Sequence, residues 1–236
     1  MLQSLTLASP RARGRVAGAV YLLFFLTAVI GALIPPGLTA PVALPTDAAA
    51  VASRITGNTT GYELEVAFGI MSTAFYVGLI ALLYRLLRPV GATAAVVMGF
   101  FGIVGSAITA VENLLQLGPT VVLGGDSYLK VFSPNQLDAI ALLVLNIAGD
   151  AGGVALVFFG VFQLALGWLI YRSTFLPRAI GVVVAVAGLG WLTYLYPPLA
   201  AFLATPLAVL GFAAEFSLML WLLIAGAAGP TKSGAS

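Results

Sequence analysis

The chain has 236 residues, of which 61% are apolar and only 8% are charged. Soluble domains carry roughly 25% charged residues, so polar groups cannot cover the surface of this chain and lipid has to cover it instead. The net charge is +2, and all ten Lys and Arg residues lie near the ends of apolar runs. No basic patch is interleaved with aromatic residues, which argues against a nucleic-acid partner.

The sequence contains neither Cys nor His. Their absence removes disulfides, thiol nucleophiles, the usual zinc sites and axial His ligands for haem. It also removes Ser-His-Asp and Cys-His catalysis. We therefore expect no cofactor and no metal centre. An intramembrane enzyme would have to work with carboxylates and tyrosines alone, which disfavours catalysis.

The first apolar run, Val16 to Ile34, follows three arginines and is 19 residues long. The apolar core of a signal peptide has roughly 7–15 residues, so this length favours an uncleaved membrane-spanning helix. In the polar connection at 37–61, Asp47 is a plausible helix N-cap. The apolar and small residues that follow it predict a short helix on the membrane surface.

Five further spanning helices are expected along the chain. They are Tyr62–Leu87, Ala92–Leu117, a stretch from Pro134 to Tyr171, Leu176–Tyr196 and Phe202–Ala225.

The stretch that begins at Pro134 would be about 55 Å long, which exceeds the ~30 Å hydrocarbon core. We expect its first part, up to about Ala148, to project from the membrane or lie on its surface. Gly149, Gly152 and Gly153 are the expected bending points, and the spacing of Gly149 and Gly153 also suits helix packing within the bundle. The fold class is therefore all-α, with six transmembrane helices forming one domain at 15–228 between tails at 1–14 and 229–236.

The basic residues predict the orientation, because cytoplasmic loops carry an excess of Lys and Arg. Arg54 and Lys130 fall on one side of the predicted topology. The other side holds Arg11, Arg13, Arg15, Arg85, Arg88, Arg172, Arg178 and Lys232. Both termini are therefore expected in the cytoplasm, with the loops at 37–61 and 119–136 outside. This is the topology of a multi-pass protein of the cell's cytoplasmic (inner) membrane.

Three stretches carry a resemblance to a known family. They are GWLIYRSTFLPRAIGVVV at 167–184, RVAGAVYLL at 15–23 and AEFSLMLWLLIAG at 214–226. Their order and spacing resemble the bacterial membrane family catalogued as domain of unknown function 4386. Family members often have Gly-Glu in the closing helix, where this chain has Ala214-Glu215. The resemblance implies six helices and implies no chemistry.

Four carboxylates fall inside the predicted spans, where ionisable residues are rare and mark function by default. Glu65, Glu112 and Asp150 each lie 20–22 residues from the cytoplasmic boundary, roughly 30–33 Å away and hence in one layer near the outer interface. Glu215 lies roughly 16 Å deep, close to the midplane. We expect all four side chains to face the interior of the bundle.

Small and polar residues accompany these acids at helical spacing. They include Gly69, Ser72, Tyr76, Asn113, Gln116, Asn146, Gly160 and Gln163. Candidate ligand- or ion-binding residues are Glu215, Glu112, Asp150, Glu65, Asn113, Gln116 and Asn146.

No Lys or Arg lies at the depth of the acids, so each ionised carboxylate needs water, a hydrogen-bond partner or a bound cation. One hypothesis is an outward-opening acidic vestibule that leads to Glu215 and binds a cation, a proton or a small polar or amine-bearing molecule. The alternative is a protonated acid that bonds to a neighbouring Ser, Tyr or carbonyl and serves packing only.

Two functions remain open from the sequence. The first is a small binding or transport protein with an acidic outward-facing cavity. The second is a non-catalytic accessory or structural subunit of a larger membrane complex. The expected partners are the lipid bilayer, a small-molecule or cation ligand in the first case, and another membrane protein or a second copy of the chain in the second.

Overall fold

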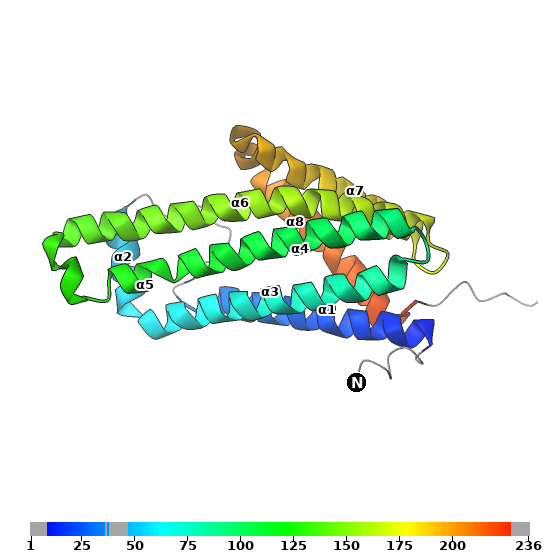
Figure 1. Cartoon of the computed structure of the whole chain (residues 1–236), viewed down its shortest axis with the longest axis horizontal. Coiled ribbons are helices and arrows are strands. Elements are labelled where there is room, and N and C mark those ends of the chain that lie inside the picture. The colour runs from blue at the N-terminus through cyan, green and yellow to red at the C-terminus, as the bar shows by residue number, and fades with distance from the viewer. Residues whose placement is uncertain (1–8, 36, 38–46, 228–236) are drawn as a thin grey trace, which may run out of the picture. The chain divides into compact units, whose positions relative to one another are not determined.

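The computed structural model describes residues 9–35, 37 and 47–227, and these residues form helices and no strand (Figure 1). The predicted tail at 229–236, Lys232 and part of the loop at 37–61 lie outside the described residues. The helices are α1 (Pro10–Leu33), α2 (Ala48–Gly57), α3 (Thr59–Leu87), α4 (Ala92–Gln116), α5 (Gly118–Val122), η2 (Ser127–Val131), α6 (Pro134–Arg172), α7 (Arg178–Trp191), η3 (Leu192–Leu195) and α8 (Pro197–Ile224).

Within the described part of the chain, six helical segments are long and apolar enough to cross a membrane, which confirms the predicted fold class. The structure begins α1 and α8 several residues earlier than the sequence predicts. Pro197 and Pro198 open α8 rather than merely ending the helix before them. Proline suits the first turn of a helix, where its missing N–H group would have no intrahelical partner.

The longest helix, α6, is unbroken over 39 residues and is about 58 Å long at 1.5 Å per residue. The helix therefore continues through Gly149, Gly152 and Gly153, the predicted bending points. Leu145, in the first part of α6, belongs to a buried cluster with Val51, Ile55, Tyr62 and Val66. This packing gives the early part of α6 a protein partner.

The short helix α2 begins where predicted, because the Asp47 carboxylate accepts hydrogen bonds from the N–H groups of Ala49 and Ala50 at 3.0 and 3.3 Å. Its apolar side chains, Val51 and Ile55, are fully buried against α3 and α6. The expectation that this helix lies on the membrane surface stays a prediction. Its apolar face packs on protein.

The described residues group into two compact units. One comprises residues 9–23, 75–106 and 154–227, and the other the described parts of 24–74 together with 107–153. Among described residues the first unit holds seven arginines and a single carboxylate, Glu215, and we call it the basic unit. The second holds seven carboxylates with Arg54 and Lys130, and we call it the acidic unit.

In the basic unit, α6 and α7 pack backbone against backbone through two glycine pairs. A Cβ atom built on Gly160 would lie 2.9 Å from the carbonyl oxygen of Gly188, and one on Gly167 would lie 2.6 Å from that of Gly181. From the first pair to the second, the glycine of α6 lies seven residues later in the chain and its partner in α7 lies seven residues earlier. The two helices therefore run antiparallel. Small residues of this kind let membrane helices approach closely. Gly149, by contrast, faces open space.

Candidate functional site

A polar cavity of about 250 Å³ lies within the acidic unit, between α1, α3 and α4. Two carboxylates and two amides line it together with hydroxyl groups and small residues. The lining residues are Phe24, Ala28, Gly31, Ala32, Glu65, Gly69, Ser72, Thr73, Thr109, Glu112, Asn113 and Gln116. Four of the seven predicted site residues therefore meet in one cavity, and no Lys or Arg lines it.

The carboxylates come from two helices. Glu65, on α3, is 1% exposed, and Glu112, on α4, is partly buried. Gln116 follows Glu112 by four residues and therefore lies on the same face of α4. Its Nε2 atom donates to Glu112 Oε1 at 3.4 Å. This bond presents the carboxylate and the amide to the cavity as one polar surface.

Glycines make room for the polar side chains of α4. A Cβ atom on Gly69 would lie 2.7 Å from Asn113 Oδ1, and one on Gly152 of α6 would lie 2.9 Å from Glu112 Oε1. Asn113 Nδ2 also donates to Thr73 Oγ1 at 3.1 Å. Asn113 is thus held against α3, and the Glu112 carboxylate is held against the α6 backbone.

The helices around the cavity are also tied through their backbones. The Tyr62 hydroxyl donates to the backbone carbonyl of Gln116, and Ser72 Oγ donates to that of Phe24 at 3.3 Å. These bonds join α3 to α4 and to α1. Buried hydrogen bonds of this kind fix the cavity walls, because breaking one would deprive a hydroxyl group of its acceptor in an apolar layer.

Asp150 and Asn146, also predicted as site residues, are exposed and do not line the cavity. The expectation that Asp150 faces inward with Glu65 and Glu112 is therefore wrong. Gly152 is the α6 residue that faces Glu112. Asp150 precedes it by two residues and so points about 200° around the helix, while Asn146 lies about 120° away from that face.

Glu215 belongs to a different cluster, in the basic unit. Its Oε1 atom accepts hydrogen bonds from Gln163 Nε2 at 2.8 Å and from the Tyr76 hydroxyl at 3.2 Å. The Tyr21 hydroxyl is a further hydrogen-bonding neighbour. Glu215 thus faces α1, α3 and α6, the orientation expected of a carboxylate that avoids lipid.

The Glu215 cluster is enclosed by aromatic rings and holds one unsatisfied polar atom. The Tyr76 ring packs against Phe159 and Phe162, with centroids 5.4 and 5.9 Å apart. Gln163 is 2% exposed, and its Oε1 atom is buried without a hydrogen-bond partner. Glu215 does not line the acidic cavity, so the continuous vestibule expected from the sequence stays a prediction.

Sequence reasoning missed two of these residues. Thr73, the partner of Asn113, follows Gly69 by four residues and lies in the same helical stripe, so spacing could have found it. Tyr21, the neighbour of Glu215, lies in an apolar run with no polar residue beside it. Among the described residues, no group of three or more Asp or Glu side chains is arranged to hold a metal ion.

Six long apolar helices and buried intramembrane carboxylates define an integral, multi-pass membrane protein. The chain belongs to the family described as domain of unknown function DUF4386, whose model matches residues 16–226. This confirms the resemblance seen in the sequence. An uncharacterized protein of Archaeoglobus fulgidus is 27% identical over 146 residues, which cover 61% of this chain and 72% of that protein. No solved structure matches the chain.

Proposed function

We propose that the protein binds a small cation, such as an amine-bearing molecule, in the cavity of the acidic unit, either as a receptor or as the binding step of transport. The observation that carries the proposal is the lining of this cavity: Glu65 and Glu112 face it and no basic residue does. A cation there would meet two carboxylates in a cavity that no Lys or Arg lines.

The cavity also offers directional groups that a bare acidic surface lacks. The amides of Asn113 and Gln116 and the hydroxyls of Ser72, Thr73 and Thr109 can accept hydrogen bonds from an ammonium group. A volume of about 250 Å³ suits a small molecule better than a lipid or a peptide. These features favour an organic amine over a fully hydrated metal ion.

We further propose that this cavity serves the outer side of the cytoplasmic membrane. The acidic unit carries only two basic residues, Arg54 and Lys130, whereas the described part of the basic unit carries seven. The positive-inside rule then assigns the loops with Arg54 and Lys130 to the outside. A ligand would reach the cavity from the medium.

The test is thermal unfolding of the purified full chain in detergent, with methylammonium, ethanolamine, putrescine, Na⁺, K⁺ and Mg²⁺ as probes. We expect at least one amine to stabilise the wild type, by about 2.7 kcal/mol at a concentration one hundred times its Kd. Glu112→Gln and Glu65→Gln keep the shape of the side chain but remove its charge, so each should reduce this stabilisation.

The matched control is Asp150→Asn, which removes an exposed carboxylate of the same unit and should leave the stabilisation unchanged. Gly152→Ala gives a second check, because its Cβ atom would push the Glu112 carboxylate while leaving the charge in place. It should weaken binding. Equal losses in Asp150→Asn and Glu112→Gln, or no stabilisation by any probe, would contradict the proposal and favour a non-catalytic accessory subunit.

A further inference from the structure

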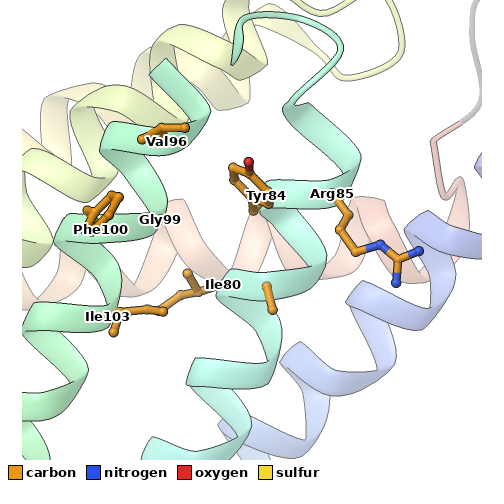
Figure 2. Close-up of a pocket in the computed structure, with 8 residues that line it drawn as sticks. Ile80, Tyr84, Arg85, Val96, Gly99, Phe100 and Ile103 are labelled. Atoms are coloured by element: carbon orange, nitrogen blue, oxygen red, sulfur yellow. The ribbon is translucent and has the colours of Figure 1, made fainter. Parts of the chain in front are cut away.

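An apolar groove of about 530 Å³ runs along the surface of the basic unit between α3 and α4 (Figure 2). It is lined by Ile80, Ala81, Tyr84, Arg85, Val96, Gly99, Phe100 and Ile103. Phe100 and Ile103 are 70% and 51% exposed, so the groove opens away from the helix bundle. In a membrane-spanning helix pair, a surface of this kind faces lipid.

The floor of the groove exists because residue 99 lacks a side chain. A Cβ atom on Gly99 would find its nearest neighbour, Tyr84 Cδ2, at 3.7 Å, which is ordinary van der Waals contact. Ala81 on α3 is similarly small. An empty groove would forfeit dispersion contacts along its walls, and an acyl chain can restore them.

Two arginines at the end of α3, Arg85 and Arg88, border the groove. Arg85 lines it, and in Figure 2 the Arg85 guanidinium extends from α3 toward α1. Arg88, one turn later, lies over the ring of Tyr84 at 6.0 Å from its centroid. On the α1 side, Arg13 and Arg85 line a small neighbouring pocket, and Arg13 Nε is buried without a hydrogen-bond partner. An anion would accept a hydrogen bond from this guanidinium and compensate the positive charge of the two arginines.

The protein does not supply that anion among the described residues of this unit. Their single carboxylate, Glu215, accepts hydrogen bonds from Gln163 and Tyr76 and lines neither pocket. We propose that an anionic phospholipid occupies this surface, with an acyl chain in the groove and its phosphate on Arg85 and the neighbouring Arg13 and Arg88. Guanidinium groups bind phosphate through paired charge-assisted hydrogen bonds.

An anionic phospholipid accounts for both the apolar groove and the arginines, whereas each alternative ligand accounts for only one of them. A zwitterionic lipid would fill the groove and leave the excess positive charge uncompensated. A free phosphate ion would bind the arginines and leave the groove empty. Each basic residue near a membrane surface contributes about 1 kcal/mol to the attraction for anionic lipid, which is roughly a fivefold change in affinity.

The test is native mass spectrometry of the delipidated full chain in detergent, titrated with dioleoyl phosphatidylglycerol or with dioleoyl phosphatidylcholine. We expect one tightly bound phosphatidylglycerol per chain and weaker phosphatidylcholine binding. Arg85→Gln should lower phosphatidylglycerol affinity by roughly fivefold and leave phosphatidylcholine unchanged. Gly99→Leu, which fills the groove, should weaken both lipids.

The matched controls are Arg172→Gln and Gly149→Leu. Arg172 is a basic residue of the same unit that lies over Trp168 at 5.2 Å and lines no part of the groove, and Gly149 faces open space. Neither change should alter binding of the first lipid. Ala81→Leu is the second groove-filling variant if Gly99→Leu does not fold. Equal affinity for both lipids, equal losses in Arg85→Gln and Arg172→Gln, or unchanged binding in the groove-filling variant would overturn the proposal.

Discussion

At Glu215, the hydrogen bonds of three helices converge on one carboxylate. Gln163 and Tyr76 both donate to its Oε1 atom, and Tyr21 is a further hydrogen-bonding neighbour. In an apolar layer a donor without a partner costs about 1–3 kcal/mol, so the hydrogen bonds to the carboxylate stabilise the fold. The cluster therefore links α8 to the rest of the basic unit.

Two substitutions of Glu215 distinguish the loss of its charge from the loss of its hydrogen bonds. Glu215→Gln retains an oxygen that can accept from Gln163 and Tyr76, so we expect a free energy of unfolding within about 1 kcal/mol of wild type. Glu215→Leu removes the acceptor of both hydrogen bonds and should lower it by about 2–6 kcal/mol. Thermal or denaturant unfolding in detergent measures both, and a Leu variant as stable as wild type would show that the cluster contributes nothing.

At the scale of the element, the contact between α6 and α7 depends on glycines that leave no room for a methyl group. The atoms that a Cβ on Gly167 would meet belong mostly to the backbone of α7, at 2.6 and 2.7 Å. A backbone cannot rotate out of the way as a side chain can, so the two helices would have to separate. The same holds for Gly188, where a Cβ atom would lie 2.8 Å from the carbonyl oxygen of Gly160.

A pair of alanine substitutions in α6 tests this packing. Gly167→Ala should destabilise the protein by about 1–3 kcal/mol, the usual effect of overpacking. Gly149→Ala lies in the same helix but meets nothing within 4 Å. It should be neutral or stabilising by up to about 1 kcal/mol, because Ala favours helix over Gly. Unfolding of both variants in the same detergent gives the comparison, and equal effects would argue against the glycine contact.

At the scale of the whole molecule, charge is segregated between the two units. Among described residues, the basic unit has seven arginines and one carboxylate, whereas the acidic unit has seven carboxylates and two basic residues. The segregation follows from where each helix end lies in the sequence. Because the positive-inside rule acts on residues near helix ends, it predicts which loops face the cytoplasm.

Single cysteines can test the orientation without interference, because the chain has no cysteine of its own. Thr59, Ser127 and Thr174 are all exposed. In intact cells, an impermeant thiol reagent should label cysteines at 59 and 127 and leave one at 174 unlabelled until the membrane is permeabilised. Labelling confined to position 174 would reverse the predicted topology.

Hydropathy along the chain determined the six spans, most of their ends and the fold class, because apolar length in a bilayer is a local property of the sequence. The same logic identified the scarce carboxylates as candidate site residues. Four of the seven candidates, Glu65, Glu112, Asn113 and Gln116, line the cavity of the acidic unit, whereas Asp150, Asn146 and Glu215 do not.

Only the tertiary structure decided which faces meet. Rotation of α6 about its axis turns Gly152 toward Glu112 and leaves Asp150 exposed, although the two residues are only two apart. Packing likewise buried α2 on protein, paired Gly167 with Gly181, and gave Glu215 its partners on distant helices. Spacing gives the angle between residues on one helix, but the rotation of each helix depends on its neighbours, whose contacts are far apart in the sequence.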